Sequence, residues 1–213
     1  MERHGRLIHG NLIVEDTHIE NERLELTNKD MHYFLGPGLT VRNCTLVLKI
    51  SAQALFFRQV RFIDCVFDVK QELKNHQQWV RASLEGCRFK GKLTGCDFGD
   101  WPEYWGDGQR GSLQDCDFRE ARLESCRFMG CDERTLRFPR WPCFTLLDPM
   151  GHGEQLRRIQ WPGEFGESLD LTLRKDPSQM KALSLFAPTE ARRYETTEDA
   201  LRSALEQLDC VVY

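Results

Sequence analysis

The bulky hydrophobic residues of this chain recur every five residues in its central part. Between Gly111 and Phe128, a small residue also stands two positions before each bulky one. The bulky residues are Leu113, Phe118, Leu123 and Phe128, and the small ones are Gly111, Cys116, Ala121 and Cys126. This spacing matches neither a helix, with a period of about 3.6, nor a strand, with a period of about 2. It aligns the bulky residues if the chain turns a corner after each unit, so that four sides form a square coil of about 20 residues.

The same pattern continues upstream with interruptions. Ala82–Leu84 and Cys87–Phe89 keep it, Gly91–Leu93 and Cys96–Phe98 resume it after a slip of one residue, and looser matches run from Leu39 to Val69. In stacked coils of this kind, about 4.8 Å apart, backbone hydrogen bonds join neighbouring coils. We expect the bulky and small residues to face the interior and the polar residues between them to face water.

This pattern resembles that of the pentapeptide-repeat proteins, over roughly half the chain. The resemblance implies a right-handed quadrilateral parallel β-helix whose stability is spread over neighbouring coils. Two insertions, near 70–80 and 99–110, interrupt the repeats. We therefore expect an irregular, mainly β member of the family, with roughly five or six coils and a length of about 25–30 Å. The first insertion is either a helical turn or a loop projecting from a corner.

The five-residue pattern stops near Pro139–Pro142. We therefore divide the chain into a β-helix with insertions, 1–143, and a small C-terminal α/β extension, 144–213, that caps the last coil. Within the extension, alternating leucines predict a strand over Phe165–Leu173, and Asp176–Ser178 predicts the start of a helix. Thr196–Asp199 predicts a second helix start, with threonine as the N-cap and acidic residues in the first turn.

Nine cysteines are the unusual feature of the composition, and an odd number leaves at least one unpaired within the chain. Six of them occupy the small inward positions of the repeat: Cys44, Cys65, Cys87, Cys96, Cys116 and Cys126. No closely spaced CxxC pair of the kind found in zinc sites occurs. We interpret the cysteines as free thiols packed in the core and expect no metal. The six histidines are scattered, and we expect them at the surface or in loops.

Charge and motifs narrow the function classes further. The chain has 29 basic and 33 acidic residues, a net charge of -4, which argues against direct nucleic-acid binding through a basic surface. The sequence contains no apolar stretch of transmembrane length and no secretory leader pattern, so we expect a cytoplasmic protein without membrane contact. Without a recognisable nucleotide, metalloprotease or nucleophile-elbow motif, we expect neither a catalytic site nor a cofactor.

The insertion at 99–110 combines aromatic and acidic residues with glycines. Two interpretations stay open. The aromatic side chains either cover the end of a coil, or they form a binding patch for another protein, since aromatic residues are enriched in interfaces. On the second interpretation the candidate partner contacts are Trp101, Glu103, Tyr104, Trp105 and Asp107.

A narrow β-helix with a filled interior has no cleft of its own, which favours binding over catalysis. By resemblance to the family, our first expectation is a bacterial immunity or antitoxin-type protein that occludes a partner protein such as a toxin. The alternative implied by the family is a DNA mimic that binds and protects DNA gyrase, although those members are long, regular and strongly negative. A third expectation is an enzyme with its site on the C-terminal extension.

Overall fold

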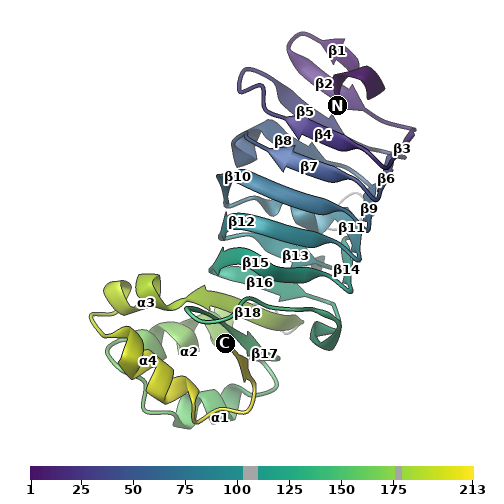
Figure 1. Cartoon of the computed structure of the whole chain (residues 1–213). Helices are drawn as coiled ribbons and strands as arrows, with labels where there is room; N and C mark the ends of the chain where they lie inside the picture. Colours follow the sequence, from purple (N-terminus) through teal and green to yellow (C-terminus); the bar gives the residue numbers. More distant parts are fainter. Residues whose placement is uncertain (103–109, 176–178) are drawn as a thin grey trace.

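Short parallel strands stack into a β-solenoid of about four turns, and a unit of helices and strands follows at its C-terminal end (Figure 1). The structure is a computed structural model that describes residues 1–102, 110–175 and 179–213. No helix in these three ranges has the length and apolar character needed to cross a membrane. The predicted mainly β fold with stacked coils and a C-terminal α/β unit is confirmed.

Three faces of the solenoid are sheets of mainly parallel strands, named A, B and C. Its last turns have a fourth face, which belongs to sheet D. Sheet A contains β1 (Arg6–Ile8), β2 (Asn11–Val14), β5 (His32–Leu35) and β8 (Leu55–Phe57), of which only β1 is antiparallel to its neighbour. Sheet B contains β3 (His18–Glu20), β6 (Thr40–Arg42), β9 (Val60–Ile63), β11 (Ala82–Glu85) and β14 (Ser112–Gln114). Sheet C contains β4 (Arg23–Leu26), β7 (Thr45–Leu48), β10 (Val66–Lys74), β12 (Arg88–Thr94) and β15 (Asp117–Glu124).

Sheet D connects the solenoid to the C-terminal unit. Its strands are β13 (Asp97–Gly99), β16 (Cys126–Met129), β18 (Met180–Phe186), β17 (Cys143–Leu147) and β19 (Val211–Val212), in that spatial order. The α-helices are α1 (Gly153–Arg158), α2 (Phe165–Lys175), α3 (Ala187–Arg193) and α4 (Glu198–Leu205). Short 3₁₀ helices are η1 (Glu2–His4), η2 (Ala52–Ala54), η3 (Gln77–Arg81) and η5 (Glu133–Thr135).

Each turn is slightly longer than the expected square coil. Along sheet B, Val41 pairs with Phe62 and Phe62 pairs with Leu84, so one turn takes a little more chain than four five-residue sides. The step from Leu84 to its partner Leu113 is longer still, because the insertion at 99–110 falls within it. Five strands in sheet B enclose about four turns, so the expectation of five or six coils is too high. The early strands carry two inward residues each, and this breaks the five-residue spacing.

The corners between sheets B and C place a residue of positive φ in every turn. These residues are Asn21, Asn43, Asp64, Gly86 and Asp115. Asn, Asp and Gly adopt this left-handed conformation at lower cost than other residues. Asn43 Nδ2 also donates to Asn21 Oδ1 of the preceding turn at 2.6 Å. The polar residues that looked like simple turn signals in the sequence therefore form a repeated structural element.

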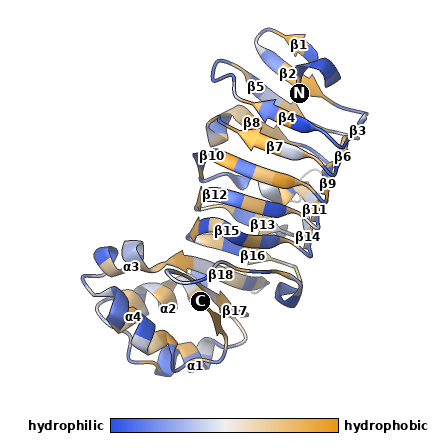
Figure 2. Cartoon of the chain, viewed as in Figure 1, coloured by the Kyte–Doolittle hydropathy of each residue, from blue (hydrophilic) through white to orange (hydrophobic). Residues whose placement is uncertain are grey.

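Aromatic rings fill the interior of the later turns. They form two columns, Phe67–Phe89–Phe118 and Trp79–Phe98–Phe128. Centroids of successive rings within a column lie 4.5 to 5.6 Å apart. The columns meet edge to face, as Phe89 and Phe98 do at 82°. The solenoid therefore has a packed core. Hydrophobic and hydrophilic residues alternate along many of its strands (Figure 2).

The first insertion is absorbed into the solenoid. β10 extends through Lys74, and the expected helical turn is η3, which directs Trp79 into the core with a fully buried side chain. His76 lies beside it, in the short connection between β10 and η3 as the loop alternative expects, but it is 1% exposed and therefore not at the surface. Its ring packs edge-on against Phe57 and Trp79, at centroid distances of 5.6 and 5.2 Å.

Two predictions for the C-terminal unit are wrong. Residues 165–175 form helix α2, because Leu169 and Leu173 occupy one buried face while Leu171 between them is 53% exposed. Met180–Phe186 forms the strand β18 rather than a helix, because it fills the space between β16 and β17 with antiparallel pairing on both sides. The predicted helix start at 176–178 lies outside the described residues.

The predicted N-terminus of the last helix is confirmed. α4 begins at Glu198, and the Oγ1 of its N-cap, Thr197, accepts a hydrogen bond from the backbone nitrogen of Ala200 at 3.1 Å. Buried Leu201 and Leu205 then face the core of the C-terminal unit. The division of the chain at 143 stays a prediction, and sheet D runs across it with strands from both sides.

Candidate functional site

The cysteines of the repeat are buried in the solenoid and are not available for chemistry. All nine are free, and the six assigned to inward positions are buried, as predicted. Each of these thiols lies close to backbone carbonyl oxygens; Cys65 Sγ, for example, is 3.3 Å from both Val41 O and Ile63 O. The neighbouring thiols of Cys87 and Cys116 raise the pKa of Cys65 and Cys87 respectively, and burial acts in the same direction. Their protonated thiols donate to the backbone and pack the corners.

Trp101 belongs to the core of the C-terminal unit. It is 2% exposed, its Nε1 donates to the carbonyl oxygen of Phe98 at 3.0 Å, and the guanidinium of Arg127 lies 4.8 Å from its ring centroid. For Trp101 the structure favours the first of the two interpretations, because its buried indole covers the end of strand β13. A partner contact by this residue stays a prediction. The other candidates, Glu103, Tyr104, Trp105 and Asp107, lie outside the described residues, and their role stays a prediction.

A groove of about 450 Å³ lies between the last turns of the solenoid and the C-terminal unit. The solenoid contributes Asp97 and Arg127, which form a two-pronged ion pair with nitrogen–oxygen distances of 2.8 and 3.0 Å. Asp97 is 1% exposed, so this pair is largely shielded from water on the carboxylate side. Because Arg127 also lies against Trp101, the tryptophan supports one wall of the groove.

The opposite wall of the groove carries a buried carboxyl group. Glu190 on α3 is 2% exposed, and its Oε2 lies 3.6 Å from an Nη atom of Arg193. Burial raises the pKa of Glu190, and the nearby Arg193 lowers it by a smaller amount. Its Oε1 has no hydrogen-bond partner within the described ranges. Behind this wall of the groove, one carboxyl oxygen is therefore buried without a hydrogen-bond partner in the described part of the chain.

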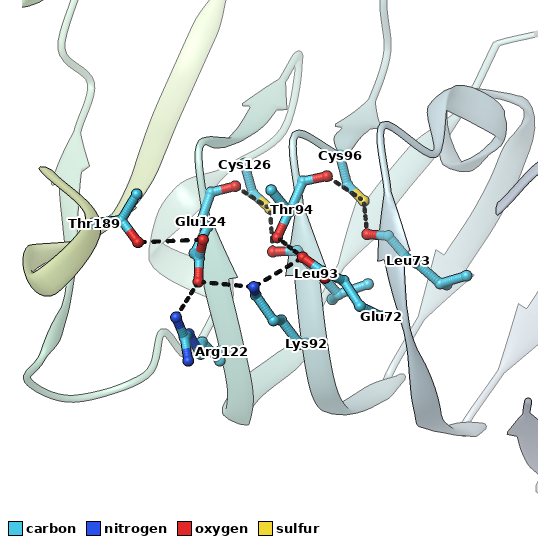
Figure 3. Close-up of polar contacts among 10 residues, drawn as sticks. All are labelled: Glu72, Leu73, Lys92, Leu93, Thr94, Cys96, Arg122, Glu124, Cys126 and Thr189. Atoms are coloured by element: carbon cyan, nitrogen blue, oxygen red, sulfur yellow. Dashed lines mark hydrogen bonds and ion pairs between the residues drawn. The ribbon is translucent and has the colours of Figure 1, made fainter. Parts of the chain in front are cut away.

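Charged side chains of both signs run across the outer face of sheet C beside this groove (Figure 3). Lys92 lies 2.9 Å from Glu72 and 3.3 Å from Glu124, and Arg122 lies 2.5 Å from Glu124. A hydrogen bond from Thr94 and the charge of Lys92 lower the pKa of Glu72. Thr189 Oγ1 also donates to Glu124 at 3.4 Å, which ties α3 to β15. The positive and negative side chains on this face therefore pair with one another.

The outer face of sheet A carries a row of apolar side chains instead, next to outward polar residues such as Asn11 and His32. Ile13, Phe34 and Phe56 lie side by side on β2, β5 and β8, because Ile13 pairs with Phe34 and Phe34 with Phe56. The two phenylalanine rings stack at 4.6 Å with an 8° interplanar angle. All three side chains are partly exposed, and Ile8 on β1, 40% exposed, extends the same face. We call Ile13, Phe34 and Phe56 the apolar ladder.

Sequence reasoning missed the apolar ladder, although the signal was present. The runs Leu12–Val14 and Tyr33–Leu35 each contain three successive apolar residues, and alternate strand residues point to opposite faces. If the outer two point inward, the central one must point outward. A hollow bordered by Ser51, Phe56 and Gln78 lies next to the ladder, with a volume of about 550 Å³.

The fold and these surfaces define a parallel β-solenoid protein with a C-terminal α/β unit and candidate binding surfaces on its outside. It is compatible with a β-helix repeat protein. No protein-family model matches the chain, and no curated protein matches its sequence.

Proposed function

We propose that this chain is a non-enzymatic protein-binding protein, and that a protein partner docks on the apolar ladder of sheet A. The observation that carries this proposal is the in-register row of Ile13, Phe34 and Phe56, three partly exposed apolar side chains on neighbouring strands. Contiguous exposed apolar surface is typical of protein interfaces, and phenylalanine is among the residues enriched there.

The packed interior supports binding over catalysis. Stacked rings such as Phe89 and Phe118, 4.5 Å apart, occupy the axis of the solenoid, so partners meet it on its faces. A face built on hydrogen-bonded parallel strands changes little on binding and loses little conformational freedom. Such a rigid surface suits an immunity or antitoxin-type protein of the kind that the pentapeptide resemblance implies, which would act by covering the functional surface of its partner.

The charge arrangement supports a protein partner over the DNA-mimic alternative. A DNA mimic needs a row of negative charges without counterions close by. On sheet C the carboxylates of Glu72 and Glu124 contact Lys92, and Glu124 also contacts Arg122. Asp117 and Arg119 form a further pair at 2.6 Å on β15. These pairs neutralise the face locally.

The proposal is tested by affinity capture from the native cell with quantification of bound proteins. We expect one protein to be bound in stoichiometric amount by the wild-type chain and lost from the Phe34→Ser/Phe56→Ser double variant. Leu171→Ser is the matched control, because Leu171 is exposed and apolar but lies on α2, away from sheet A. Retention of the same partner by the double variant would overturn the proposal, and so would loss of that partner from the Leu171 variant alone.

The immunity mechanism has its own test. The captured partner is purified, its toxicity or enzymatic activity is measured, and the wild-type chain is added at increasing ratio. We expect complete inhibition at one equivalent, and inhibition weakened by the Phe34/Phe56 substitutions. A partner whose activity is unaffected when fully bound would contradict the immunity mechanism while leaving protein binding intact.

A further inference from the structure

Three potential metal ligands meet at the far end of the C-terminal unit. His152 directly precedes α1, and Asp209 and Cys210 directly precede β19. One donor atom from each side chain lies within 4.8 Å of the other two. The backbone holds the two segments together, since Leu147 N donates to Cys210 O at 2.7 Å and Leu146 pairs with Val211.

The orientation of His152 suits a ligand. Its Nδ1 lies 3.1 Å from the backbone carbonyl oxygen of Asp148. In the tautomer that donates this hydrogen bond, Nε2 carries a free lone pair. Histidines that bind metals in proteins are commonly held by the same contact between the second ring nitrogen and a carbonyl oxygen.

Cys210 differs from the cysteines that pack the corners of the solenoid. It is one of the three cysteines outside the inward positions of the repeat, the others being Cys131 and Cys143. Its side chain is 4% exposed, and the acidic residues Asp209 and Asp148 lie near enough to act electrostatically on the thiol. Its place beside the paired strands β17 and β19, rather than at a corner of the solenoid, brings its thiol next to His152 and Asp209.

We propose that His152, Asp209 and Cys210 bind one divalent transition-metal ion, with Zn²⁺ the best match. An imidazole, a thiolate and a carboxylate form a mixed donor set that this ion accepts, and a water molecule would complete four-coordination. Ligand atoms around tetrahedral Zn²⁺ are about 3.3–3.8 Å apart, so donor atoms that lie within 4.8 Å of one another need to approach by at most about 1.5 Å. Exposed Asp209 has the freedom to make this adjustment.

The binding step balances simply. The S–H bond of Cys210 breaks, a sulfur–metal bond forms, and the proton passes to solvent, while the neutral imidazole donates its lone pair and Asp209 its carboxylate. The ion would join the turn before α1 to the C-terminal strand β19. Because the unfolded chain does not hold the three ligands together, binding would stabilise the folded C-terminal unit.

The test is a titration of the full-length chain with Co²⁺ as a spectroscopic probe, followed by displacement with Zn²⁺. We expect a thiolate-to-cobalt charge-transfer band that saturates at one equivalent, disappears on addition of Zn²⁺ and is insensitive to Mg²⁺. Cys210→Ser should abolish the band. His152→Asn and Asp209→Asn should weaken Co²⁺ binding at least about tenfold.

Two controls keep the result interpretable. Cys131→Ser removes a partly exposed thiol outside the cluster and should leave the titration unchanged. Asp209 is exposed, so Asp209→Asn should keep the native circular dichroism spectrum, and its weaker binding then reflects the ligand itself. A band that survives in Cys210→Ser, a band lost in Cys131→Ser, or no Co²⁺ binding at micromolar concentrations would overturn the proposal.

Discussion

Acidification should destabilise the solenoid through His76, which is 1% exposed among aromatic rings. Burial lowers the pKa of His76 from 6.5 to about 4, and a hydrogen bond with the Ala52 backbone opposes this shift only in part. Between these two values the unfolded chain binds a proton that the folded chain does not. The contribution of His76 to the free energy of unfolding is therefore fully present above about pH 6.5 and is lost as the pH falls toward 4.

The size of this effect follows from the two pKa values. A fall from 6.5 to about 4 corresponds to about 3 kcal/mol across the whole interval. That is a large part of the roughly 5–15 kcal/mol by which a domain is usually stable. Carboxylates such as Glu72 and Asp117, whose pKa values are lowered by their partners, lose their own contribution at still lower pH.

The assay is urea unfolding at several pH values between 7.5 and 4.5. Wild type and His76→Gln are compared, because glutamine stays neutral over this range. Down to pH 4.5 we expect the stability of the wild type to fall by about 2.5 kcal/mol more than that of the variant. His18→Gln serves as the control, since His18 is exposed on β3, and should behave as wild type. Identical pH dependence in wild type and His76→Gln would show that protonation of His76 is not coupled to unfolding.

Three further predictions concern the core and its corners. Phe89→Ala should reduce the free energy of unfolding by about 3–5 kcal/mol in denaturant titrations, because the buried ring of Phe89 lies between those of Phe67 and Phe118. A loss below about 1 kcal/mol would contradict the stacked core. Gly86→Ala should lower the free energy of unfolding by about 1 kcal/mol or more, since Gly86 has a φ of +63° and an added Cβ would stand 2.4 Å from Asp64 Oδ1. An unchanged free energy of unfolding would argue against the corner geometry. The buried thiols of the native chain should react with a disulfide reagent only on unfolding. Cys131 is partly exposed and should react fastest of the nine, although burial raises its pKa to about 12. Rapid labelling of Cys65 or Cys87 in the native chain would contradict the packing.

The last turns of the solenoid were predictable because their spacing is regular. From Gly111 to Phe128 each side contributes one inward bulky residue, so the five-residue period is visible in the sequence. The first turns were harder, because strands such as β2 and β5 carry two inward residues each and the apolar ladder adds a third apolar position between them. A regular period cannot be recognised where both faces of a strand are apolar.

The C-terminal unit was predicted less well for a different reason. Leu169, Leu171 and Leu173 fit a strand by alternation, but Leu169 and Leu173 also lie four positions apart, as one face of a helix requires. Whether this segment forms a strand or a helix depends on the elements that pack against it. β18 already occupies the place between β16 and β17, and its partners come from distant parts of the sequence, as in the pairing of Cys126 with Ser184.

The candidate sites were harder still to predict from the sequence, because they are formed by residues that are far apart along the chain. His152 and Cys210 are far apart in the chain and meet only because β17 and β19 pair. Trp101 was a plausible surface aromatic until its burial against Arg127 was known. Composition alone does not distinguish a tryptophan that covers a strand end from one that contacts a partner.

The most direct test of the central claim, that a protein partner docks on sheet A, is photo-cross-linking in the native cell. A photoreactive amino acid is placed at position 34 in the apolar ladder and, in a separate chain, at position 171 on α2. We predict a single covalent adduct with the captured partner from position 34 and none from position 171. An adduct from position 171 but not from position 34 would contradict docking on the apolar ladder.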